Sequence, residues 1–163
     1  MDENGSCDKL YSGKDGSVLI DFYGEEAGDQ FGSSAGGLVN RKHAFLVVGA
    51  PNAGPGDRGR IYVYGGREGK LAFMIESDEK GSQLGGMFVS VVGDVDSDGT
   101  PDVYASDWNH GAKGPQTGRI YVHFGADGKR LMTLTGESGG DGFGIGPADA
   151  GDVDGDGHAD LVI

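Results

Sequence analysis

Two short segments of the sequence each place four aspartates within nine residues, a spacing that can bind a metal ion. They read GDVDSDGTPD from Gly93 and GDVDGDGHAD from Gly151. Carboxylates at this density repel one another and destabilise a fold unless something neutralises them. In the pattern D-x-D-x-D-G-x-x-D, side chains 1, 3 and 5 can converge on one point. Glycine at position 6 permits a positive φ, and position 9 adds a fourth carboxylate.

The donors in both segments are hard oxygens, which favour Ca²⁺ over zinc or copper. An EF-hand loop begins in the same way but requires a glutamate at position 12, where this chain has Ala105 and Ile163. The alternative is an acidic, solvated turn without a metal, but its recurrence at a repeat spacing favours two calcium sites. The expected ligands are Asp94, Asp96, Asp98, Asp102 and the carbonyl of Thr100 in the first loop, and Asp152, Asp154, Asp156, Asp160 and the carbonyl of His158 in the second.

The acidic loops belong to a repeat of nearly 60 residues. GRIYVYGG begins at Gly59 and GRIYVHFG begins 59 residues later, at Gly118, while the two acidic loops are 58 residues apart. A fainter first copy precedes them, since LYSGKDGSVLIDF from Leu10 resembles VYGGREGKLAFMI from Val63. Such periodicity indicates a repeat architecture rather than a low-complexity chain, despite the high glycine content.

Short β-branched or aromatic segments bounded by glycine indicate an all-β fold. About four strands fit into each repeat, and a repeated four-stranded antiparallel unit of this length is typical of a β-propeller blade. The expected strands cover residues 8–11, 18–23, 44–49, 60–64, 71–76, 88–93, 102–106, 119–124, 130–135 and 159–163.

The first repeat resembles the FG-GAP repeat of integrin α-subunit β-propellers. Phe31-Gly32 stands at the FG position and Gly49-Ala50-Pro51 at the GAP position; later copies have Leu84-Gly85 with Ser106-Asp107-Trp108, and then Phe143-Gly144. The resemblance implies about three blades' worth of FG-GAP-type sequence in a single propeller region, with each acidic loop closing the first hairpin of its blade. It divides the chain into a half blade (1–30), two blades (31–77 and 83–135) and a second half blade (141–163).

The corresponding stretch of the first repeat has no carboxylate between Gly36 and Pro51 and carries Arg41, Lys42 and His43. A cationic loop does not attract calcium, so no metal is expected there.

Net charge and composition limit the possible partners. The formal net charge of −13 argues against binding to nucleic acid or to an anionic membrane surface. No apolar run approaches the length of a membrane-spanning helix, so membrane insertion is not expected. Calcium sites of extracellular modules often have affinities of only ~10⁻⁴–10⁻³ M, which suits a secreted or cell-surface protein.

One further set of residues could contact a ligand. Asp107, Trp108 and His110 combine an acid, an aromatic ring and a base, as sugar-binding loops do, although a polar loop is the plainer interpretation. The sequence shows no nucleophile motif and no phosphate-binding loop, so we expect no enzyme activity.

Three functions remain open: a calcium-stabilised structural or adhesive module that binds protein or glycan, a lectin-like propeller, and an accessory domain of a larger secreted enzyme. The half blades suggest completion by further blades of a longer chain, or by a second copy added head to tail in a ring or filament.

Overall fold

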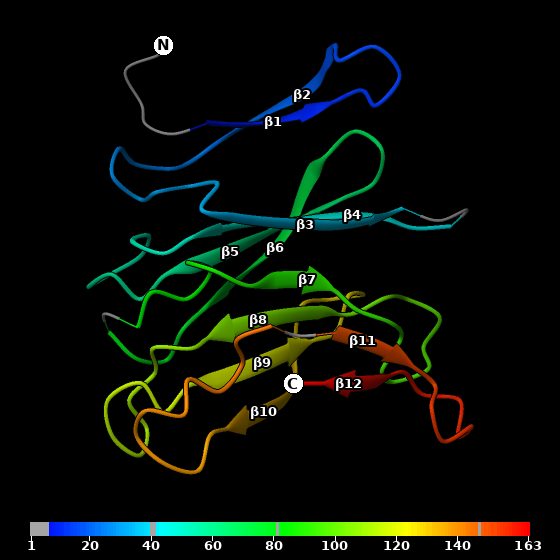
Figure 1. Ribbon diagram of the computed structural model, residues 1–163. Helices are drawn as coiled ribbons and strands as arrows, with labels where there is room; N and C mark the ends of the chain where they lie inside the picture. The colour runs from blue at the N-terminus through cyan, green and yellow to red at the C-terminus, as the bar shows by residue number, and fades with distance from the viewer. Residues whose placement is uncertain (1–6, 40–41, 81, 147) are drawn as a thin grey trace.

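The computed structural model of the protein describes residues 7–39, 42–80, 82–146 and 148–163 (Figure 1). Within these ranges the fold is all-β, and no helix is long and apolar enough to cross a membrane. The strands are β1 (Cys7–Tyr11), β2 (Val18–Tyr23), β3 (Ser34–Val39), β4 (Ala44–Ala50), β5 (Arg60–Gly65), β6 (Lys70–Glu76), β7 (Val89–Val91), β8 (Val103–Asp107), β9 (Arg119–His123), β10 (Arg130–Thr135), β11 (Ala148–Gly151) and β12 (Asp160–Val162).

The strands form two four-stranded antiparallel sheets and two hairpins. The first sheet has the order β3-β4-β5-β6 and the second the order β7-β8-β9-β10, so each sheet follows the chain without a crossover. Strands β1 and β2 form a hairpin before the first sheet, and β11 and β12 form another after the second. In Figure 1 the β1–β2 hairpin lies against one face of the first sheet, whose other face meets the second sheet.

Alternation along the central strands supplies apolar residues to both faces of each sheet. In the first sheet, Val47 and Ile61 join a core shared with the second sheet, whereas Val48 and Tyr62 join a core shared with the β1–β2 hairpin. In the second sheet, Tyr104 faces a third core that includes Leu161 of the last hairpin. Three apolar layers therefore hold four sheets in a stack.

The contact between neighbouring sheets has the same geometry twice. Gly59, before β5, has φ of 80°, and a Cβ atom there would lie 2.3 Å from the backbone nitrogen of Leu84. Gly118, before β9, also has φ of 80°, and a Cβ atom there would lie 2.3 Å from the backbone nitrogen of Phe143. Only glycine accepts both the conformation and this close approach. The repeat in the sequence therefore corresponds to a repeated contact between successive sheets.

All ten expected strands are confirmed, with ends that differ by a residue or two. Strand β3 was not expected, whereas β11 overlaps the stretch near residues 144–149 in which the last half blade is expected to have its first strand. Strand β3 has the sequence SAGGLV, whose two glycines hide the alternation that marks a strand. A Cβ atom on Gly36 would lie 3.0 Å from the carbonyl oxygen of Val89, so the close approach of β7 accounts for that glycine.

Candidate metal centres

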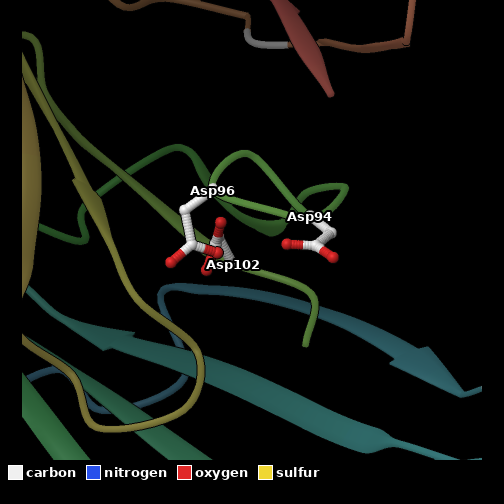
Figure 2. A group of neighbouring side chains, drawn as sticks. All are labelled: Asp94, Asp96 and Asp102. Carbon is white, nitrogen blue, oxygen red and sulfur yellow. The ribbon is translucent and has the colours of Figure 1, made fainter. Parts of the chain in front are cut away.

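Each acidic loop joins the two strands of an antiparallel hairpin. The first loop connects β7 to β8, and the second connects β11 to β12. In the first loop the carboxylates of Asp94, Asp96 and Asp102 each offer an oxygen, and these oxygens lie within 4.8 Å of one another (Figure 2). Ligand oxygens of one Ca²⁺ lie at most about 5 Å apart, so this spacing fits a common ion.

Hydrogen bonds from the backbone hold the first loop in this shape. Asp94 accepts from the amides of Asp98 (3.0 Å) and Gly99 (2.7 Å), while Asp98 accepts from Thr100 (2.7 Å). The loop is therefore wound around its first carboxylate.

Asp102 is the buried anchor of the first loop. Its side chain is fully buried, and its two oxygens accept from the amides of Val95 (2.8 Å) and Gly125 (2.9 Å). Burial raises the pKa of the Asp102 carboxyl above its ordinary value, the two backbone hydrogen bonds oppose the rise, and the charges of Asp96 and Asp94 add to it. A cation in the loop would favour the ionised form.

The second loop repeats this hydrogen-bond pattern. Asp152 accepts from Asp156 (3.0 Å) and Gly157 (2.9 Å), Asp156 accepts from His158 (2.9 Å), and Asp160 accepts from Val153 (2.7 Å). Here the carboxylates of Asp152, Asp154 and Asp156 have oxygens within 4.8 Å of one another, and all three side chains are exposed.

The structure gathers six of the eight expected carboxylates into two clusters. Asp98 and Asp160 lie outside them, although each accepts the same backbone hydrogen bond as its clustered counterpart in the other loop, Asp156 or Asp102. Thr100 is half-buried, and His158 is exposed with Nδ1 lying 2.7 Å from the carbonyl oxygen of Val95.

The matching stretch of the first repeat differs, as its sequence indicates. The turn between β3 and β4 contains Lys42 and His43, and Arg41 lies outside the described residues. No cluster of metal-binding side chains is found among the described residues of this stretch. The absence of calcium there stays a prediction.

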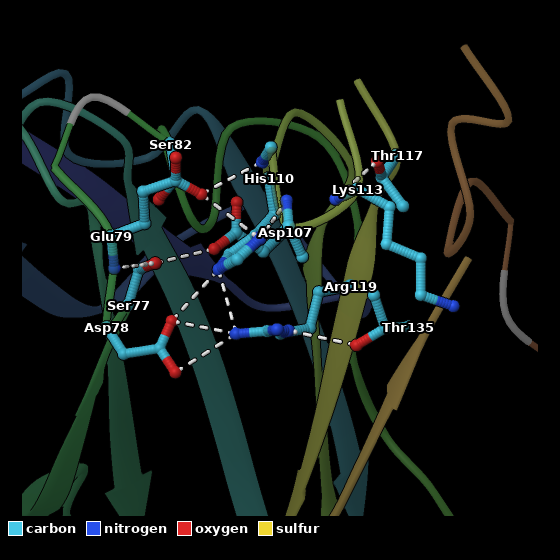
Figure 3. Close-up of polar contacts among 12 residues, drawn as sticks. Ser77, Asp78, Glu79, Ser82, Asp107, His110, Lys113, Thr117, Arg119 and Thr135 are labelled. Carbon is cyan, nitrogen blue, oxygen red and sulfur yellow. Dashed lines mark hydrogen bonds and ion pairs between the residues drawn. The ribbon is translucent and has the colours of Figure 1, made fainter. Parts of the chain in front are cut away.

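Asp107 and His110, expected on a polar loop, are buried and belong to a hydrogen-bond network between the two four-stranded sheets, which also includes the exposed Asp78 (Figure 3). Asp107 accepts a 2.6 Å hydrogen bond from Ser77, and burial raises the pKa of its carboxyl. Nε2 of His110 lies 2.9 Å from a carboxylate oxygen of Asp78 and 2.9 Å from Nη1 of Arg119, and Nδ1 lies 3.1 Å from a carboxylate oxygen of Glu79 and 3.1 Å from the amide nitrogen of Ala112.

Asp78 is the centre of this network. It also contacts Nη1 of Arg119 at 3.1 Å and accepts a 3.0 Å bond from the hydroxyl of Tyr121. Burial alone would raise the pKa of Asp78, but the bonds from His110 and Tyr121 and the charge of Arg119 together hold it below its usual range. Sequence reasoning missed Asp78, although an acidic residue recurs six positions before Phe31, Leu84 and Phe143.

Of the three candidate ligand-binding residues, only Trp108 retains appreciable exposure. An open hollow of about 570 Å³ lies nearby, and its described lining includes Glu79, Asn109 and Gln116 but none of the three. The sugar-binding interpretation stays a prediction, and two of its three residues, Asp107 and His110, bond to other residues of the protein.

Comparison with protein-family models gave no match, and no curated protein matches the chain.

Proposed function

We propose that the protein is a calcium-binding, non-catalytic β-propeller module of the FG-GAP type, serving structure or adhesion outside the cell. The observation that carries the proposal is the recurrence of one pattern of backbone-to-aspartate hydrogen bonds in two hairpin loops, each of which also gathers three carboxylates. An acidic turn that arose by chance would not be expected to recur at the repeat spacing with the same backbone hydrogen bonds.

The donor set fits calcium. Asp94, Asp96 and Asp102 in the first loop, and Asp152, Asp154 and Asp156 in the second, would supply carboxylate oxygens, which hard cations prefer. A bound ion would neutralise repulsion among these aspartates and draw the strands of each hairpin together. Its role would be structural, because it would brace the turn between strands.

The propeller interpretation is supported by the repeated contact between sheets. Each sheet meets the next through glycines in equivalent positions, as Gly59 meets Leu84 and Gly118 meets Phe143. Units that stack with one repeated geometry form either a closed ring of blades or an open array. The hairpins at both ends of the stack leave strand edges that a second copy or further repeat units would complete.

A structural role is also supported by the placement of the polar residues. Asp107 and His110 bond to neighbours within the fold, where they link the segment after β6 to the second sheet. An extracellular location is proposed from the calcium argument, since millimolar calcium outside the cell would fill sites of low affinity.

Thermal unfolding with and without calcium tests this function. Only the folded loops gather the ligands, so the melting temperature should rise with calcium concentration and return after chelation. Magnesium at the same concentration is the control, because it accepts all-protein cages of carboxylates less readily. A melting temperature insensitive to calcium up to 10 mM, on the order of ten times the weakest expected dissociation constant, would rule out the proposal.

A further inference from the structure

Two positions recur at each place where one sheet packs on the next. They lie nine and six residues before Phe31, Leu84 and Phe143, which open successive repeats. The first position is apolar and the second is acidic. The residues are Phe22 and Glu25, then Ile75 and Asp78, then Leu134 and Glu137.

At the first two places an arginine pairs with the acid, whose side chain stays nearly half exposed (47% and 46%). Arg60 Nη1 lies 2.7 Å from Glu25, and Arg119 Nη1 lies 3.1 Å from Asp78. Both arginine side chains are about one-fifth exposed, at 20% and 19%, so the two ion pairs have the same setting. Each arginine begins the third strand of the following sheet.

A tyrosine two residues after each arginine covers the apolar position. Tyr62 packs in one core cluster with Phe22 and Phe31. Tyr121 packs in another with Ile75 and Leu84. At both places a strand with the sequence Arg-x-Tyr therefore packs its tyrosine on the apolar residue and pairs its arginine with the acid.

At the third place the same positions are uncovered. Leu134 is 42% exposed, whereas Phe22 and Ile75 are 5% and 1% exposed. Among the described residues the Glu137 carboxylate has no hydrogen bond or ion pair. The adjacent edge is also open, because β12 pairs only with β11, whereas β4 and β8 each pair with two neighbours.

We propose that the surface formed by Leu134, Phe143 and Glu137, beside the open edge of β12, is a docking site for an Arg-x-Tyr strand of a further repeat unit. The backbone of that strand would pair with β12, its guanidinium would meet Glu137, and its tyrosine ring would cover Leu134. The inference rests on the repeat architecture proposed above and is independent of calcium.

The first strand of a second copy fits this surface poorly. Strand β1 stands where β5 and β9 stand in the later sheets, but it carries Cys7 at the arginine position and Lys9 at the tyrosine position. Cys7 offers Glu137 no cation, and Lys9 would place an ammonium group over Leu134. Lys9 is moreover paired with Asp21 of its own hairpin. Charge complementarity therefore favours a partner unit with Arg-x-Tyr.

A binding measurement tests the site. The probe is a fluorescent, head-to-tail cyclised peptide of residues 58–77, which carries the β5–β6 hairpin and whose ring lowers the ordering cost of binding. We expect saturable binding to the full chain, both in calcium and in chelator. The peptide with Arg60→Gln should bind about two- to fivefold more weakly, as should the intact peptide to the Glu137→Gln chain. The Leu134→Ala chain should bind about tenfold more weakly.

A charge exchange separates this site from adventitious binding. The Glu137→Arg chain should lose affinity for the wild-type peptide and regain it for the Arg60→Glu peptide. A cyclised peptide of residues 7–23 is the matched control for docking of a second copy, and it should bind at least tenfold more weakly. No binding at 1 mM peptide, equal binding of the two peptides, or indifference to Glu137 would each overturn the inference. Because the binding assay runs with and without calcium, a failed calcium proposal would not be mistaken for a failed docking site.

Discussion

The backbone amide of Ala159 donates a 2.9 Å hydrogen bond to the carbonyl of Asp94, so the two acidic loops are in direct contact. Ser97 donates to the carbonyl of Gly157 across the same boundary, and His158 reaches the carbonyl of Val95. The candidate ion sites are thus neighbours in space although they are 58 residues apart in sequence.

The glycine that precedes the third strand of each four-stranded sheet should be intolerant of substitution. Gly59→Ala would force a Cβ into the backbone of Leu84 at a positive φ, so we expect a loss of at least about 2 kcal/mol in the free energy of unfolding. Gly66→Ala is the matched control, because Gly66 has φ of 75° with open space around it, and it should cost about 1–2 kcal/mol. Urea denaturation measures both; equal losses would contradict the packing argument.

Asp102 should stabilise the fold even without calcium. Asp102→Asn replaces one acceptor with a donor that faces the amide of Val95 or Gly125, which should cost roughly 1–3 kcal/mol in chelator. Asp160→Asn changes the equivalent but less buried residue of the second loop and should cost less. Denaturation of both variants in chelator provides the comparison, and a larger loss for Asp160→Asn would contradict the assignment of Asp102 as the anchor.

The buried carboxyl of Asp107 should make stability depend on pH. Burial raises its pKa in the folded state above the ordinary value of 3.8, so the folded protein favours the neutral form. The stabilisation from this group is complete below pH 3.8 and is lost as pH rises through the folded-state pKa. Asp107→Asn stays neutral, so the variant should gain stability relative to the wild type from pH 4 to pH 7. Thermal melts of both proteins from pH 4 to pH 7 measure the difference in stability between the variant and the wild type. A difference that does not change with pH, or that falls as pH rises, would contradict the prediction.

Much of the fold was predictable because its signals are local. Strands such as RIYVYG alternate visibly, and the repeat of glycine-bounded segments marks the units. Strand β3 was missed because its glycines do not show the alternation of a strand. Gly36 is needed there because the backbone of Val89 in the next sheet lies close to it, and the neighbouring sequence gives no sign of that contact.

The candidate metal loops were predictable for a similar reason, since nine consecutive residues contain the whole pattern. The role of Asp102 as a buried anchor was not, because the amide of Gly125 comes from a turn 23 residues away. The network around Asp78 was also missed, because it joins a segment after β6 to residues more than 30 positions later. Its only sequence signal is the recurring acid six residues before each Phe-Gly or Leu-Gly pair.

The central claim is that both acidic loops bind calcium, and isothermal titration calorimetry on the chelated, dialysed protein tests it most directly. We expect two ions per chain for the wild type, one for Asp96→Ala, one for Asp154→Ala and none for the double variant. Circular dichroism should show that each variant keeps its β-sheet spectrum. Absence of binding heat at millimolar calcium, supported by unchanged melting temperatures, would show that the loops are solvated turns and would contradict the account.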